Sequence, residues 1–138
     1  MTFESKSLAR LIHEVNATGN EFKAGCEVEQ VDHYIGICNS INSDKYICTV
    51  KHWQWWDLDI EGDQKELFGK TGQSQCVIKA DYVIDDQLGR FNEGDWVRTS
   101  LLQTFHENCI FETANTFYLL VGKGTRRKID AGLAGALF

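Results

Sequence analysis

Residues 46–50, Tyr46-Ile47-Cys48-Thr49-Val50, decide the fold class, because the spacing of apolar side chains changes at this point of the chain. From here on β-branched and aromatic residues dominate and the pattern approaches a period of two, which is typical of strands. Three further segments share this character, at 75–84, 96–105 and 116–121. The sequence therefore predicts four strands, in a sheet of about four to six.

The chain before Tyr46 has a different pattern. Its apolar side chains recur at steps of three and four residues, which is the spacing of an amphipathic helix. This spacing predicts one helix over about 5–16 and a second over about 27–40, separated by residues 17–20 with Gly19 as the helix-ending residue.

Turn-forming residues separate the predicted strands, at 85–89, 92–94 and 122–124. Glycine together with Asp or Asn is typical of tight turns, so we expect consecutive strands to pair antiparallel. The predicted fold class is α+β: two N-terminal helices packed on an antiparallel β-sheet meander. A chain of 138 residues fits a single domain, 1–138. Its parts are a helical region at about 1–44, a strand-rich region at about 45–130 and an apolar C-terminal tail at 131–138.

Composition and charge restrict the class of protein. Apolar residues make up 43% and charged residues 25%, as in an ordinary globular domain. No apolar run reaches the roughly 20 residues that cross a bilayer, and five scattered cysteines without a CxxC pair suit a reducing cytoplasm. The net charge of −6 opposes direct nucleic-acid binding, which needs clustered Lys and Arg. It leaves room for a larger protein partner that is basic or itself binds nucleic acid, although an acidic balance more often serves to keep a cytoplasmic domain soluble.

The densest motif runs from His52 to Asp59 and contains three of the four tryptophans. On a strand Trp53 and Trp55 share one face and Trp56 takes the other, so we expect at least one of these rings at the surface or at an interface. Core packing is the more common use of such a cluster, and an interface hot spot is the alternative. The predicted partner-binding residues are Trp53, Trp55, Trp56, Asp57 and Asp59.

A second candidate site is polar. Residues 123–128 form the chain's one basic cluster, after a glycine turn, and such a segment can hold an anion. Arg98 and Glu112 are expected to pair across strands or to line a groove with these cations. The alternative, anion-binding site therefore consists of Arg98, Glu112, Asn115, Lys123, Arg126 and Arg127.

Metal and catalytic motifs are incomplete. Asp57 begins a stretch that resembles a calcium loop, but Phe68 stands where the closing bidentate Glu is required. Cys109 lies near His106 and Cys48 near His52, yet neither pair has an oxyanion loop or a strand-to-helix elbow around it. We therefore predict no metal, no cofactor and no catalytic residue. A polar groove can belong to a small-ligand or anion-binding protein as well as to an enzyme.

Several segments carry a family resemblance: Tyr82-Val83-Ile84-Asp85, Gly94-Asp95-Trp96-Val97-Arg98-Thr99-Ser100 and Tyr118-Leu119-Leu120-Val121-Gly122. Together with residues 53–59 they resemble a small uncharacterised domain family of proteobacterial genomes, often found near mobile elements. The resemblance implies a small bacterial protein, and it supplies no activity and no catalytic residues.

These observations lead to a functional hypothesis. The chain is expected to be a non-enzymatic protein-binding module. It could be an inhibitor of defence systems, of the kind that phages or mobile elements encode, or a toxin-immunity protein. In either case it would act by occluding its partner through a strand edge and exposed aromatic side chains. The alternative is a small-ligand or anion-binding protein, or an enzyme, that uses the polar site. The apolar tail 131–138 is expected to pack on its own domain, and a homodimer formed through it is the alternative.

Overall fold

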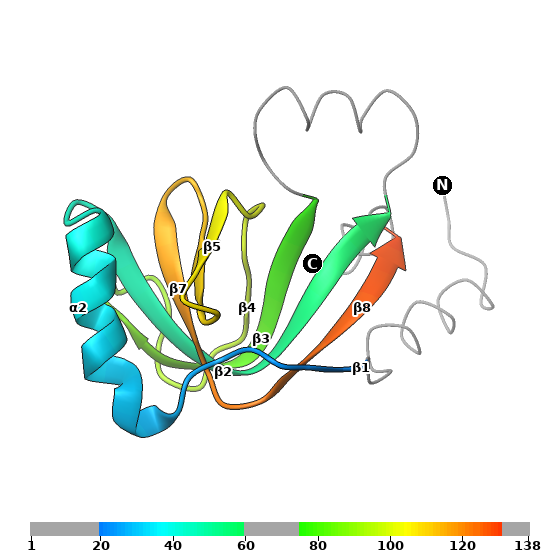
Figure 1. Ribbon diagram of the computed structural model, residues 1–138, viewed down its shortest axis with the longest axis horizontal. Coiled ribbons are helices and arrows are strands. Elements are labelled where there is room, and N and C mark those ends of the chain that lie inside the picture. Colours follow the sequence, from blue (N-terminus) through cyan, green and yellow to red (C-terminus); the bar gives the residue numbers. More distant parts are fainter. Residues whose placement is uncertain (1–19, 60–74, 131–138) are drawn as a thin grey trace.

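The computed structural model describes residues 20–59 and 75–130, which form one strongly curled sheet with a helix against it (Figure 1). The elements are β1 (Asn20–Phe22), the 3-10 helix η1 (Val28–Gln30), α2 (Val31–Ile41), β2 (Tyr46–Asp59), β3 (Cys76–Asp86), β4 (Val97–Arg98), β5 (Thr104–His106), β6 (Ile110–Glu112), β7 (Thr116–Val121) and β8 (Gly124–Asp130).

The helix predicted over about 27–40 is confirmed as η1 followed directly by α2. The Gln30 side chain accepts a hydrogen bond from the backbone N–H of Glu27, which starts the helix, and Asn42 ends it. The other predicted helix, over about 5–16, lies outside the described residues, and within them α2 is the one α-helix. No helix in this part of the chain is long and apolar enough to span a bilayer.

The long strand β2 organises the sheet. Along one edge it pairs antiparallel with β3, and along the other edge it pairs parallel with β7 and then with β8. The sheet is therefore mixed, and the prediction of an antiparallel meander is wrong. The reason is that Gly122-Lys123-Gly124 is a bend and not a hairpin: β7 and β8 run one after the other in the same direction along the 14 residues of β2.

The predicted strand over 96–105 is also corrected. Only Val97–Arg98 and Thr104–His106 form strands there, and they belong to opposite ends of the curl. β4 pairs with β3, whereas β5 pairs with β6, so the residues between them cross from one part of the sheet to the other. The predicted strands at 75–84 and 116–121 are confirmed as β3 and β7.

The direction of the curl follows from contacts between distant strands. β7 and β6 separate β2 from β5, yet the rings of Trp55 on β2 and Phe105 on β5 lie 4.9 Å apart, edge to face. Phe111 on β6 contacts the same indole at 5.1 Å. The sheet therefore closes around Trp55, and its concave side holds the main apolar cluster. The helix α2 packs against the opposite face, over Ile47 and β7.

A local break in β2 permits this bend. His52 has a positive φ of 55°. Val50 and Trp53 are three residues apart and both face the concave cluster, although a regular strand would place them on opposite faces. On the neighbouring strand Val83 and Ala80 do the same. Both strands therefore lose their alternation at one level, and the sheet bends there.

Candidate functional site

The tryptophan cluster belongs to the core. Trp53, Trp55 and Trp56 are at most 4% exposed. Trp53 and Trp55 face the concave cluster, and Trp56 lies on the other face with Val77 and Ile129. The expectation that at least one of these rings lies exposed is wrong, because both faces of β2 are covered at this level. The exposed indole of the described chain is that of Trp96, at 50%.

The structure joins residues from the two predicted sites. Arg126 on β8 donates two hydrogen bonds to the Asp57 carboxylate, at 2.7 and 3.0 Å. Its guanidinium also lies over the rings of Phe22 and Trp55, 5.0 and 5.1 Å from their centroids. A bidentate pair is the strong form of such an interaction. Arg126 is therefore occupied by Asp57 and by the rim of the concave core.

Arg98 and Arg126 do not meet. Arg98 lies opposite Lys79 on β3, and β3 and β2 separate β4 from β8. Two intervening strands put the backbones roughly 14 Å apart. Arg126 lies beside Trp55 on the concave side of the sheet. The Val97 side chain also faces the concave side, so the side chain of the next residue, Arg98, points to the opposite face.

Glu112 has its own partners at the far end of the sheet. Its carboxylate accepts a hydrogen bond from the Lys45 ammonium at 2.5 Å and contacts His106 Nε2 at 2.7 Å. Burial alone would raise the pKa of Glu112, but these two partners outweigh it and hold the pKa below its usual value. Glu112 forms no ion pair with Arg98 or Arg126, so the expected cross-strand pair with Arg98 is absent from the described residues.

The remaining predicted residues are spread over the sheet. Asn115 is exposed in the turn before β7, and Lys123 is exposed in the bend before β8. Arg127 lies opposite Trp56 and Asp59 opposite Asp130, both in the pairing of β2 with β8. The anion-site residues therefore do not converge on one place. The apolar tail at 131–138, with the homodimer that it suggested, lies outside the described residues.

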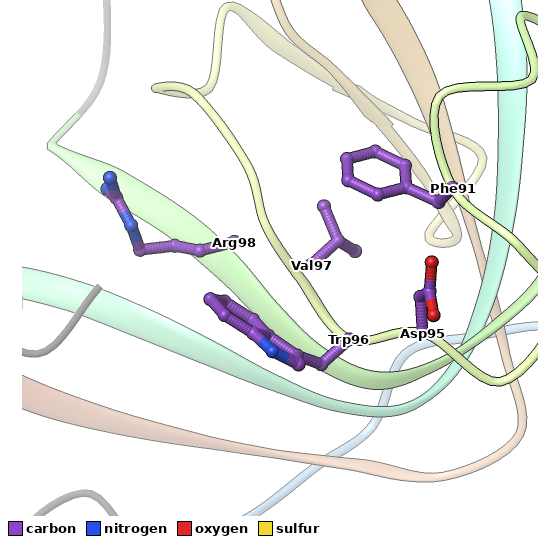
Figure 2. A pocket seen from close by; sticks show the side chains of 5 residues that line it. All are labelled: Phe91, Asp95, Trp96, Val97 and Arg98. Carbon is purple, nitrogen blue, oxygen red and sulfur yellow. The ribbon is translucent and has the colours of Figure 1, made fainter.

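A hollow of about 370 Å³ lies beside β4, lined by Phe91, Asp95, Trp96, Val97 and Arg98. Figure 2 shows Phe91 and Val97 on one side of it, with the Trp96 indole and the Arg98 side chain extending along the other. Successive side chains of a strand point to opposite faces. Val97 and Arg98 form β4, and Asp95 and Trp96 directly precede it, so the hollow is lined by side chains of both faces of β4 and by the loop that leads into it.

A buried carboxylate fixes Phe91 at this hollow. The Asp86 side chain is fully buried, and its Oδ2 accepts hydrogen bonds from the backbone N–H groups of Arg90 and Phe91 at 2.9 and 3.3 Å. Arg90 adds its guanidinium through Nε at 3.3 Å. Burial alone would raise the pKa of Asp86, but the bonds from Arg90 and Phe91 outweigh it and lower the pKa.

The other wall of the hollow is tied to β3. The Val83 N–H donates to the carbonyl of Asp95, and the Gly94 N–H donates to the carbonyl of Val83, both at 2.8 Å. Asp95 Oδ2 also accepts the backbone N–H of Asn92 at 2.8 Å, which closes the turn before Trp96. The loop that presents Trp96 is thus held by backbone bonds, and the indole projects from a rigid base.

Arg98 contributes a charge without an internal counter-ion. No carboxylate of the described residues lies within ion-pair distance of its guanidinium. Its neighbour across the strands is Lys79, which pairs with Asp81. Two cations directly opposite one another destabilise a strand pair. The hollow therefore carries a positive end at Arg98.

The sequence contains a signal for this site. Trp96 and Arg98 follow the turn at 92–94 and lie at the start of the strand predicted over 96–105. A tryptophan placed directly after a turn, next to alternating charges, is a candidate for exposure because strand ends are less covered than strand centres. The density of tryptophans at 53–56 suggested an interface, although such a cluster is equally typical of a core.

The five cysteines are buried thiols. Burial raises the pKa of Cys38 and that of Cys48 to about 12, so little of either thiol is ionised near neutral pH. A thiolate is the nucleophilic form of cysteine.

In the described chain no group of three His, Cys, Asp or Glu side chains is arranged to hold a metal ion.

A family model described as Domain of unknown function (DUF6957) matches residues 23–134, which is most of the chain. The chain belongs to this family. The DUF6957 region begins after β1 and includes the remaining described elements and the whole hollow beside β4. No curated protein and no solved structure matches the chain.

Proposed function

We propose that this DUF6957 protein is a non-enzymatic protein-binding module whose contact surface is the edge of β4. The observation that carries the proposal is a half-exposed Trp96 beside a hollow lined by Phe91 and Arg98. Tryptophan and arginine are enriched among the residues that dominate binding energy at interfaces. An exposed large ring on a rigid loop loses little conformational entropy when a partner covers it.

The lining of the hollow favours binding over catalysis. Among the described residues this lining contains one carboxylate, at Asp95, and one guanidinium, at Arg98, and it includes no Ser, Cys, His or Lys side chain. Nucleophilic catalysis needs a nucleophile such as Ser or Cys within hydrogen-bond reach of a base, and the described lining residues do not offer that pair. The anion-binding alternative has less support, because Arg126 and Glu112 already have partners of opposite charge.

The proposal includes a biological setting. A small cytoplasmic protein of a proteobacterium, encoded by a phage or near a mobile element, would act as an inhibitor of a defence system or as a toxin-immunity protein by covering a larger partner. The acidic balance of −6 supports a partner that is basic overall or binds nucleic acid, because opposite charges steer association. Five reduced cysteines suit such a compartment.

Affinity capture with matched variants tests the proposal. The full chain serves as bait in lysate of the native host, beside Trp96→Ala and Tyr46→Ala. Tyr46 is the control because its exposed fraction, 48%, nearly equals the 50% of Trp96. It also lies far from β4: Gln54 is the β2 residue at the level of Arg98, and Tyr46 is eight residues away from it, roughly 25 Å along the strand. A partner near one-to-one ratio, retained by Tyr46→Ala and lost by Trp96→Ala, is expected.

The loss of affinity on Trp96→Ala should be large. Removing a hot-spot tryptophan costs about 2 kcal/mol or more of binding free energy, which is roughly a 30-fold loss of affinity. Equal capture by the wild-type chain and by Trp96→Ala would contradict the proposed surface. Alanine at Trp55 or Trp56 cannot serve here, because both indoles are buried and their loss would disturb the fold.

A further inference from the structure

The backbone of β4 presents hydrogen-bonding groups to the hollow. The Thr99 N–H donates to the carbonyl of Ile78 and the Ile78 N–H donates to Thr99 Oγ1, both at 2.9 Å, so Thr99 and Ile78 are a hydrogen-bonded pair next to Arg98 and Lys79. Pairs of this kind alternate with pairs that exchange no hydrogen bonds. Arg98, opposite Lys79, is therefore in the second kind of pair, and its N–H and carbonyl point away from β3.

This edge has the components of a strand-binding groove. One residue offers outward backbone groups, and the hollow beside it has apolar walls from Phe91 and Val97. An extended peptide that joins a sheet edge gains affinity from main-chain hydrogen bonds and specificity from pockets that take alternate side chains. The hollow lies beside β4, which is where such a peptide would lie.

Charge identifies the side chain that the peptide would bring to Arg98. Arg98 lies opposite Lys79 in the pairing of β4 with β3, and its guanidinium has no carboxylate partner among the described residues. A carboxylate placed beside Arg98 would supply the counter-ion that this guanidinium lacks among the described residues and can accept two parallel hydrogen bonds. Asp95 at the other end is already bonded to the Asn92 N–H, and it disfavours a second carboxylate there.

We propose that the β4 edge binds an extended segment of a partner protein as an added strand, with an Asp or Glu side chain on Arg98 and an apolar side chain in the hollow over Val97. This inference rests on the proposed function and names the chemistry of the partner's contacting segment. An acidic segment can belong to a partner that is basic overall, since one residue meets Arg98.

A selection with charge reversal tests the preference for a carboxylate. A phage-displayed library of random decapeptides is panned on the full wild-type chain, on Arg98→Glu and on Lys123→Glu. Lys123 is the matched control, because it is exposed in the bend before β8, on another strand of the sheet. Arg98→Glu is expected to fold, since glutamate opposite Lys79 makes a favourable pair.

The wild-type chain and Lys123→Glu are expected to enrich peptides with Asp or Glu next to an apolar residue, and Arg98→Glu to enrich Lys or Arg instead. A synthetic peptide of the wild-type consensus should bind Arg98→Glu at least about tenfold more weakly. Peptides that lose binding on Trp96→Ala but ignore the reversal at Arg98 would overturn this inference and leave the proposed function standing. No enrichment over a blank support would overturn the inference as well.

Amide hydrogen exchange tests the added strand with the same consensus peptide. The Arg98 amide is expected to exchange at least about tenfold more slowly when the peptide is bound, because it gains a backbone acceptor. The Thr99 amide already donates to Ile78 and serves as the internal control with little change. An Arg98 amide that keeps its rate while the peptide is bound would show that the peptide binds in another way.

Discussion

At the scale of single residues, glycine at position 124 is dictated by one ring. A Cβ atom there would lie 2.3 Å from carbon atoms of the Trp53 indole, so the strand and the ring pack against each other without a side chain between them. The indole Nε1–H also donates to the Gly122 carbonyl at 3.2 Å. Trp53 therefore fixes the bend between β7 and β8 from inside the core.

Alanine at Gly124 tests this close packing. We expect Gly124→Ala to lower the free energy of unfolding by about 1–3 kcal/mol or more, because Trp53 is buried and has little room to move. The matched variant is Gly36→Ala on α2, where a Cβ meets nothing within 4 Å and should stabilise by about 0.5–1 kcal/mol. Urea unfolding followed by tryptophan fluorescence measures both, and equal effects would contradict the packing.

A second residue-scale prediction concerns Asp86 and pH. The pKa of Asp86 is lower in the folded chain than in the unfolded chain, so its carboxylate contributes stability that is fully present above the unfolded pKa, about 4. That contribution is lost as the pH falls through the lower folded pKa. The wild-type chain should therefore lose stability below roughly pH 4 more steeply than Asp86→Asn does.

The neighbouring Asp85 provides the comparison, since its side chain is exposed. Asp85→Asn should retain the acid sensitivity of the wild-type chain, whereas Asp86→Asn should be less stable at neutral pH by about 1–3 kcal/mol. Urea midpoints at a series of pH values measure these slopes. Parallel slopes for wild type and Asp86→Asn would show that this carboxylate is not a main acid-sensitive group.

At the scale of elements, β2 determines how much of the fold could be predicted. Its β-branched and aromatic residues indicated a strand, and the spacing in 27–40 indicated the helix that became η1 and α2. The partners of β2 were not predictable, because a glycine bend that continues a strand has the same composition as a hairpin. The split of 96–105 was missed because its apolar spacing does not show which sheet edge each half joins.

The break in β2 at His52 carries a prediction of its own. A non-glycine residue at φ 55° is strained, and a β-branched side chain is strained most. We expect His52→Val to destabilise the fold by about 1–2 kcal/mol, whereas His52→Gly should be neutral or stabilising. Thermal unfolding of the three chains measures the order. Equal stability of the Val and Gly variants would mean that the bend relaxes and does not require this backbone conformation.

At the scale of the whole molecule, one tryptophan is half-exposed and three are buried in the core. Trp55→Ala should cost about 3–5 kcal/mol of unfolding free energy, because the ring is buried against Phe105 and Phe111. Trp96→Ala should change stability by less than about 1 kcal/mol, since half of its surface is already exposed. Urea unfolding of both variants measures this contrast, and a large loss for Trp96→Ala would place its ring in the core.

The candidate site was the least predictable part. Family membership gives the extent of the domain and not its role, and the three tryptophans named from the dense motif are core residues. Arg98 was named for an anion groove with Arg126, but the pairing of β4 with β3 and of β8 with β2 separates the two. Long-range pairing decides which side chains share a surface, and local patterns do not contain it.

Photo-crosslinking in cells tests most directly whether the edge of β4 contacts a partner protein. A photoreactive phenylalanine analogue is placed at position 96 or at position 46 of the full chain, in cells of the native host, and irradiated. The account predicts a covalent adduct of one defined protein from position 96 and none from position 46, although both positions are about equally exposed. The absence of an adduct at position 96, or the same adduct from both positions, would contradict it.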